Sequence, residues 1–250
     1  MTGFLGAAQF LTRIPIRLPA PVAHARAVPW FPVVGALIGA GIGAVAAGMA
    51  HLVPVPVAGV TAVMVGLLIT GAFHEDGLAD VADAFGGGWT IERRLEILKD
   101  PRHGTYGVAA LGGSIAIRVV CAASIVSPAA LFATFVAAHT LGRAAAVAAM
   151  KVAPPAVESG LGVTAATSLR TSLAAIGIAA GVALTALVCG WWVAPFVGAS
   201  VVAAGAVVAL AIRKIGGLAG DVLGAAEQVV ECLVMIVATG LAARHAIWWS

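Results

Sequence analysis

Residues 172–212 read SLAAIGIAAGVALTALVCGWWVAPFVGASVVAAGAVVALAI and contain no acidic or basic side chain. An apolar run of about 20 residues is long enough to cross the hydrocarbon core of a bilayer as a helix. Trp191, Trp192 and Pro195 interrupt the run near its middle, and tryptophan is favoured where a helix meets the membrane surface. The stretch therefore predicts two membrane-spanning helices, 172–191 and 193–212, joined by a tight turn.

The rest of the chain has the same apolar character. Its residues are 61% hydrophobic and 10% charged, whereas soluble domains carry about 25% charged residues. Runs without strand-like alternation predict helices, because a segment in lipid must satisfy its own backbone hydrogen bonds. The further predicted spans are 30–52, 55–73, 107–126, 128–150 and 222–243. We therefore predict an all-α polytopic membrane helix bundle of about seven transmembrane helices, built as a single integral membrane domain over residues 1–250.

Three smaller observations describe the class of protein and its helix packing. The three cysteines are far apart in apolar runs, which indicates free thiols rather than a disulfide framework or a zinc site. The net charge is only +3, and no run of Lys and Arg contains interleaved aromatic residues, so nucleic acid is not an expected partner. Gly35, Gly39 and Gly43 recur every four residues, a spacing typical of close helix packing in membranes.

Lys and Arg are distributed unequally between the two predicted sides of the membrane. If residues 1–29 lie on one side and the spans alternate, that side receives eleven basic residues and the other receives only Arg244. The positive-inside rule then places the N-terminus and the loop 74–106 in the cytoplasm. The acidic residues follow the same division, Glu158 included. Chemistry on one membrane face is therefore favoured over transport.

The loop 74–106 concentrates the acidic residues of the chain. Seven of the eleven lie in one 26-residue stretch, 75–100. On a helix continuing from the second span, Asp76, Asp80 and Asp83 would lie within a sector of about 60°. Like charges this close destabilise a helix unless a cation joins them, and Mg²⁺ or Mn²⁺ prefers carboxylate oxygens. We predict a metal site that these three side chains hold.

A second acidic pair follows on a short predicted helix, 91–99. Glu96 and Asp100 are four residues apart, and the glycines at 86–88 could fold this helix against the first one. One or two metals held by the combined acids could polarise a phosphate group. We therefore predict Glu96 and Asp100 as further metal ligands.

Two of the predicted ligands are also candidates for catalysis, Asp83 and Asp100. Asp100 would serve either as a ligand or as the base that takes the acceptor hydroxyl proton. The alternative interpretation of the whole stretch is a solvated acidic loop with salt bridges to Arg93, Arg94 and Lys99.

Further polar residues around this loop and in the spans are candidates for substrate binding. A guanidinium such as that of Arg102 can grip a phosphate with two hydrogen bonds. A charge within a span, such as Arg143, needs a partner or an aqueous cavity. Asp221 suits either a helix N-cap or a substrate contact, and His74 is a candidate ligand or proton-transfer group. The full predicted set is His74, Lys99, Arg102, Gly104, Arg143, Asp221 and Glu227.

Several of these segments together resemble a known family. They are FHEDGLADVAD at 73–83, LEILKD at 95–100, RHGTYG at 102–107 and GGLAGD at 216–221. They resemble cobalamin synthase, the family of adenosylcobinamide-GDP ribazoletransferases or cobalamin-5′-phosphate synthases. The resemblance implies transfer from adenosylcobinamide-GDP to α-ribazole or α-ribazole 5′-phosphate. GMP would leave, and adenosylcobalamin or its 5′-phosphate would form. It also implies a Mg²⁺ requirement and the cytoplasmic membrane of a bacterium or archaeon.

Two other functions remain open from the residues. The spacings of Asp80 with Asp83 and of Glu96 with Asp100 are similar to those of CDP-alcohol phosphotransferases, which make phospholipids, although Ala84 stands where they have Gly. A cation transporter would usually carry polar residues near the bilayer midplane in broken helices, but these acids lie at the membrane edge. The sequence also leaves open a homo-oligomer.

Overall fold

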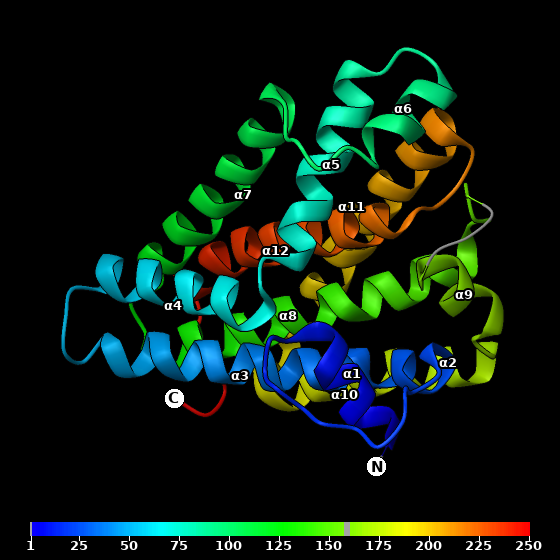
Figure 1. Ribbon diagram of the computed structural model, residues 1–250. Helices are drawn as coiled ribbons and strands as arrows, with labels where there is room; N and C mark the ends of the chain where they lie inside the picture. The colour runs from blue at the N-terminus through cyan, green and yellow to red at the C-terminus, as the bar shows by residue number, and fades with distance from the viewer. Residues whose placement is uncertain (1, 158–160) are drawn as a thin grey trace.

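The computed structural model describes residues 2–157 and 161–250, so Glu158 lies outside the described part. That part is mainly helical and contains no β-strand. The helices, shown in Figure 1, are α1 (Thr2–Leu11), α2 (His24–Ala27), α3 (Phe31–Met49), α4 (Val55–Thr70), α5 (Phe73–Gly87), α6 (Ile91–Ile97), α7 (Thr105–Ser124), α8 (Pro128–Val152), α9 (Leu161–Ser168), α10 (Thr171–Cys189), α11 (Val193–Ile215) and α12 (Gly220–Ala242).

The polytopic helix bundle predicted from the sequence is confirmed. Among the residues that the structure describes, five helical segments are long and apolar enough to cross a membrane: His24–Met49, Thr105–Ser124, Pro128–Val152, Thr171–Ile215 and Gly220–Ala242. The fourth is 45 residues long and contains both α10 and α11, which a 3-10 turn at Gly190–Trp192 separates. The bent pair α4 and α5 would make a sixth segment. This count is lower than the predicted seven partly because it takes α10 and α11 as one segment, although the turn at Gly190–Trp192 separates them as the sequence predicted.

The second predicted span differs most from expectation. The helix α4 ends at Thr70, and α5 runs at 90° to it. Gly71 and Ala72 both adopt left-handed backbone conformations, with φ values of 68° and 55°, which turn the chain between the two helices. The expectation that the acids lie on a helix continuing from the second span is therefore wrong. They lie on a separate helix, α5, outside the five apolar segments.

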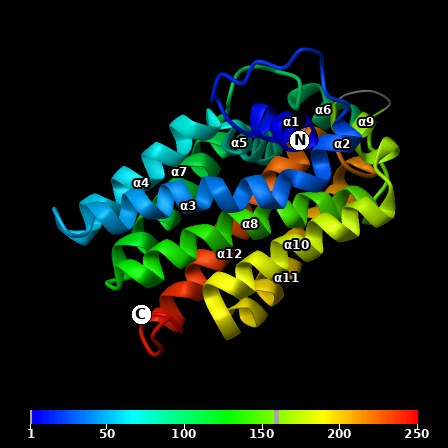
Figure 2. The ribbon, with the colours of Figure 1, turned by 90° about the horizontal axis from the view of Figure 1, so that it is seen from below.

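The helix α8 lies at the centre of the bundle, with α3, α10 and α12 packed around it (Figure 2). A Cβ atom at Gly35 would lie 2.5 Å from the carbonyl oxygen of His139, and one at Gly39 would lie 2.4 Å from that of Phe135. The role of the α3 glycines in close packing is therefore confirmed. This contact brings the backbones of α3 and α8 together, and His139 and Arg143 of α8 reach Glu231 on α12.

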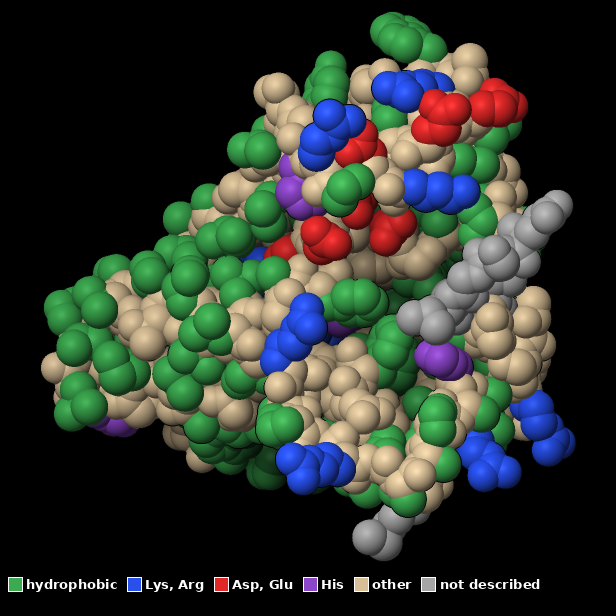
Figure 3. Space-filling view, in the orientation of Figure 1, with side chains coloured by type: hydrophobic (Ala, Val, Ile, Leu, Met, Phe, Trp, Pro, Cys, Tyr) green, Lys and Arg blue, Asp and Glu red, His purple; other side chains and the backbone are tan. Residues whose placement is uncertain are grey.

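The acidic helices gather at one end of the molecule. In Figure 1 the helices α5 and α6, the first turns of α7 and the end of α11 lie together above the layer of α3, α8 and α10. Arg94 on α6 donates a hydrogen bond to the carbonyl oxygen of Lys214 on α11, at 2.8 Å, and so ties α6 to the bundle. Figure 3 shows the acidic side chains grouped over this end, whereas the α3–α4 end is apolar.

Candidate metal and substrate site

Three side chains at the acidic end form a group that could hold a metal ion, and we call them the acidic triad: Asp76, Asp80 and His103. The two aspartates lie one turn apart on α5, and His103 comes from the loop between α6 and α7. The His103 Nε2 atom lies 3.3 Å from Asp76 Oδ1, and its Nδ1 atom lies 3.3 Å from Asp80 Oδ1. One ligand atom from each residue falls within 4.8 Å of the others.

The electrostatics of the acidic triad favour a cation. The pKa of Asp80 is raised to about 6, first by partial burial and then by the negative charges of Asp76 and Asp221, while His103 opposes the shift. A carboxyl group with such a pKa carries negative charge that its surroundings do not balance. A bound cation would supply that balance.

Asp83 is buried on the same helix but faces a different partner. Its Oδ2 atom accepts a hydrogen bond from the backbone N–H of Gly104, at 2.6 Å. Gly104 is the N-cap residue of α7, so the carboxylate sits at the positive end of that helix. A Cβ atom at Gly107 would lie 2.2 Å from Asp83 Oδ2, so glycine is needed for this close approach. The structure thus places Asp83 against the start of α7 and outside the acidic triad.

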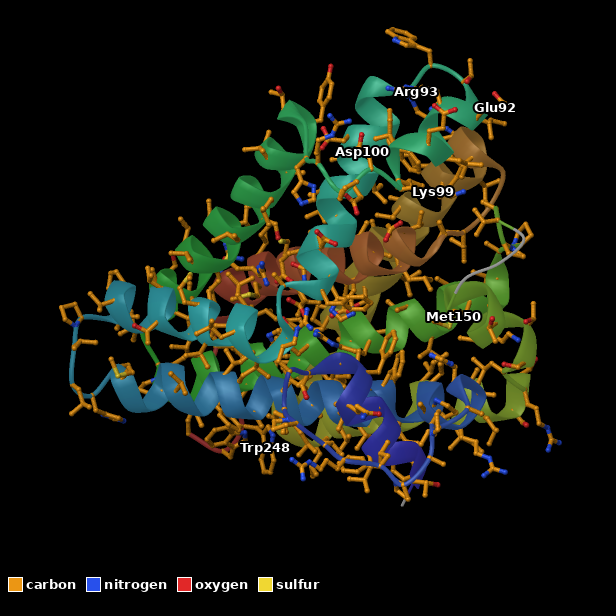
Figure 4. All side chains as sticks on the ribbon, in the orientation of Figure 1. Glu92, Arg93, Lys99, Asp100, Met150 and Trp248 are labelled. Atoms are coloured by element: carbon orange, nitrogen blue, oxygen red, sulfur yellow. The ribbon has the colours of Figure 1, made fainter. Side chains whose placement is uncertain are left out.

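The other two predicted metal ligands also lie apart from the acidic triad. Glu96 pairs with Arg93 at 2.9 Å on the exposed face of α6. Asp100 pairs with Arg102 at 2.8 Å, and hydrogen bonds from Arg102 lower the pKa of Asp100 to about 2. Figure 4 shows Arg93 at the outer end of the region, with Lys99 and Asp100 closer to the body of the bundle. Both acids therefore already have a protein cation beside them.

A second group of charged residues is buried between α5, α7, α8 and α12. We call it the buried ion network; it consists of Glu75, Glu227, Glu231, Arg118, Arg143, His74 and His139, all at most 6% exposed. Arg143 contacts both Glu227 and Glu231. Arg118 lies 2.8 Å from Glu75 and 3.4 Å from Glu231. Each carboxylate within the apolar bundle thus lies beside an arginine, which lowers the cost of burying these charges.

The histidines extend the buried ion network at both ends. His139 Nδ1 lies 2.7 Å from Glu231 Oε1, and His74 Nε2 lies 2.8 Å from Glu227 Oε2. The His74 Nδ1 atom is buried and has no hydrogen-bond partner in the structure. His74 and Glu227 also line a neighbouring cavity, so one end of the network reaches open space.

That cavity has a volume of about 670 Å³ and lies between the N-terminal helices, α5, α6, α8 and α12. This volume is typical of small-molecule sites. One side is polar and is lined by His74, Asp76, Lys99, Asp221 and Glu227. The apolar part of the lining includes Phe10, Phe31, Phe73, Leu98 and Met150. The cavity therefore joins an acidic triad residue, Asp76, to one end of the buried ion network.

The structure brings together some of the predicted substrate-binding residues but not all. His74, Lys99, Asp221 and Glu227 line the cavity. Arg143 is fully buried behind it, and Arg102 and Gly104 are not part of its lining. Because α12 begins at Gly220 with Ala219 as its N-cap, Asp221 lies in the first turn and does not cap the helix through its side chain.

Sequence reasoning missed His103, Glu75 and His139. His103 was visible in RHGTYG, but no periodicity connects this loop to α5, so its place beside the acids could not be found. Glu75 and His139 had a clearer signal. A charged or ionisable residue next to or within a span needs a partner, and each of them meets one.

The fold and the site define a polytopic α-helical membrane protein with a polar cavity and an acidic triad at one end. The comparisons with known proteins make the assignment specific. The family model for cobalamin-5-phosphate synthase matches residues 3–239, and the chain belongs to this family.

Relatives in this family are similar along nearly their whole length. The adenosylcobinamide-GDP ribazoletransferase of Bradyrhizobium diazoefficiens is 42% identical, over 93% of this chain and 91% of its own. The enzyme of the same name from Shewanella frigidimarina is 36% identical, over 95% of both chains. That of Vibrio cholerae is 34% identical, over 94% and 92%. No solved structure matches this chain.

Proposed function

We propose that this chain is an adenosylcobinamide-GDP ribazoletransferase. It would join adenosylcobinamide-GDP to α-ribazole or α-ribazole 5′-phosphate and release GMP, giving adenosylcobalamin or its 5′-phosphate. The family match over residues 3–239 carries this proposal. The cavity beside the acidic triad supports it, because the reaction needs a site that can hold a phosphate-bearing donor next to an acceptor.

The chemistry of the acidic triad fits a divalent cation. Two carboxylates are the usual protein ligands of Mg²⁺ and Mn²⁺, and such ions keep further positions for water and substrate phosphate. The imidazole of His103 is a ligand more typical of transition metals, so Mn²⁺ is a candidate ion in addition to Mg²⁺. We propose that Asp76, Asp80 and His103 hold the ion. When bound, it would neutralise negative charge on the diphosphate linkage of the donor.

The remaining residues contribute positioning and electrostatics, which dominate the catalysis of phosphoryl transfer. Lys99 lines the cavity that Asp76 also lines, so its ammonium group can meet a phosphate there. Asp100 has a pKa of about 2 because of Arg102, and such a carboxylate is a weak base at neutral pH. A phosphate-binding role for Arg102 would require it to leave or share Asp100.

We also propose that the acidic end faces the cytoplasm. The unequal distribution of Lys and Arg supports this orientation. The nucleotide-activated donor is a cytoplasmic type of metabolite, which agrees with it. Accessibility of a cysteine introduced at Glu92 to a membrane-impermeant thiol reagent tests the orientation. Labelling in inverted vesicles but not in intact cells is expected, and the reverse pattern would contradict it.

The activity is tested with purified protein in liposomes. The protein is incubated with adenosylcobinamide-GDP, α-ribazole 5′-phosphate and Mg²⁺, and GMP and corrinoid product are both measured. Product that disappears with EDTA and in Asp80→Ala is expected. The absence of product from folded protein with either acceptor form would overturn the proposal, and CDP-activated donors would then be assayed in the same way.

A further inference from the structure

The apolar side of the cavity carries a continuous group of aromatic rings. The Phe10 ring stacks on Phe31 with centroids 5.4 Å apart and meets Phe73 edge-on at 5.3 Å. Phe73 in turn lies 5.0 Å from the ring of His74. Phe31 is 5% exposed, whereas Phe73 is 45% exposed. The aromatic wall therefore has a buried base and an open phenyl edge next to His74.

His74 is prepared to accept one hydrogen bond. Its Nε2 atom lies 2.8 Å from the Glu227 carboxylate, which can only accept, so Nε2 carries the proton and donates it. In the neutral ring Nδ1 then holds a free lone pair, and this atom is buried without a partner. Buried polar atoms are almost always satisfied. Because His74 is one of the residues that line the cavity, a ligand that brings a donor to this ring would satisfy the acceptor.

From these two observations we infer that the cavity binds the acceptor nucleoside, with its planar base against Phe10 and Phe73 and a ribose hydroxyl donating to His74 Nδ1. The inference rests on the proposed function, because the acceptor named there is a ribazole. A benzimidazole-type base is flat and largely apolar, and stacking on phenyl rings suits it. Its ribose hydroxyls supply the donor that His74 lacks.

The guanine of the donor is the competing occupant of the wall. Guanine carries amide and amino groups along its edge, and burying them without partners costs free energy. The wall of Phe10, Phe31, Leu98 and Met150 offers side chains without strong hydrogen-bonding atoms. It therefore favours the less polar base. Asp76 lines the same cavity, so an acceptor bound here would share that cavity with one residue of the acidic triad.

Binding is measured by equilibrium dialysis of protein in nanodiscs, without donor and without metal. The two probes are α-ribazole and the free benzimidazole base. Phe73→Ala should raise the Kd of both probes about tenfold, the range found when a stacking ring is removed. His74→Phe should raise the Kd of α-ribazole about fivefold or more and leave that of the base unchanged, because only the ribose contact is lost. Trp89→Ala, an exposed aromatic outside the cavity, should change neither.

The controls separate this inference from the proposed function. Size-exclusion profiles and melting temperatures check that each variant folds. If His74→Phe does not fold, Phe73→Ala still tests the inference, because Phe73 is exposed and its replacement should not disturb the fold. Equal Kd values in wild type, Phe73→Ala and Trp89→Ala would overturn the inference even if the wild type turns over. A Phe73→Ala variant whose KM rises for the donor but not for the acceptor would assign the wall to guanine and also overturn it. A wild type that binds α-ribazole but makes no product would contradict the proposed function alone.

Discussion

The acidic triad and the buried ion network both concentrate carboxylates, but their charges are balanced differently. In the buried ion network Arg118 and Arg143 lie between three glutamates within the apolar bundle. In the acidic triad two aspartates share one histidine at the protein surface, and the pKa of Asp80 is raised to about 6. The difference indicates that the carboxylates of the network are already paired with cationic groups of the protein, whereas the triad suits a cation from solution.

The largest expected effect comes from breaking the buried ion network. Glu231→Ala would leave Arg118 and Arg143 short of a partner in an apolar interior. Removing one partner of a buried ion pair costs about 3–5 kcal/mol. Reversible unfolding in mixed micelles should show that loss in the free energy of unfolding. Glu96→Ala, which breaks an exposed pair, should cost about 0–1 kcal/mol. Equal losses in the free energy of unfolding for Glu231→Ala and Glu96→Ala would show that burial does not determine the cost of breaking these ion pairs.

Asp80→Asn should act on function rather than on folding. The loss of one carboxylate ligand is expected to lower Mn²⁺ affinity and turnover by at least about 100-fold, a typical cost of losing a metal contact. The melting temperature should not fall, because the repulsion from Asp76 and Asp221 is relieved. Titration with Mn²⁺ followed by electron paramagnetic resonance measures the affinity. The matched control is Asp100→Asn. An equally large loss of Mn²⁺ affinity in that variant would instead place the cation site near the end of α6.

Metal binding should depend on pH through Asp80. Its pKa is about 6, so the carboxylate is ionised above this pH and protons compete with the cation below it. Mn²⁺ affinity should therefore fall about tenfold for each pH unit below 6 through this one group. Asp100, with a pKa of about 2, stays ionised throughout this range. A pH profile that is unchanged in Asp80→Asn would contradict this assignment.

The smallest effect is expected from Asp83→Asn. The amide oxygen of Asn can still accept the hydrogen bond from the Gly104 N–H. Mn²⁺ affinity should change by less than about tenfold if Asp83 holds the start of α7 and does not hold the metal. A loss equal to that of Asp80→Asn in the same titration would instead support the sequence prediction that Asp83 is a ligand.

The sequence was most informative where one physical rule dominated. Apolar runs such as 172–191 and 128–150 predicted helices close to the observed α10 and α8, because lipid allows few other structures. The i, i+4 spacing of Asp76 and Asp80 placed them on one helix face. The spacing of the α3 glycines likewise predicted a close helix contact, which the structure shows between α3 and α8.

The sequence could not show where separate segments meet. Gly71 and Ala72 adopt left-handed backbone conformations that turn α5 away from α4. No local sequence pattern predicted this 90° bend. Glu96 and Asp100 have the spacing of ligands, yet each lies beside an arginine close by in the chain. His103 joins the acids because the loop before α7 returns to α5, which Asp83 fixes through Gly104.

The sequence by itself determined the membrane-spanning class, the segment that holds the acids and the family resemblance. These depend on composition, helical period and short motifs, which are local properties of the chain. Only the tertiary structure decided which carboxylates face a cavity and which are already balanced. That choice depends on contacts between α5, α8 and α12, residues far apart in sequence, and on the burial that sets the free-energy cost of each charge.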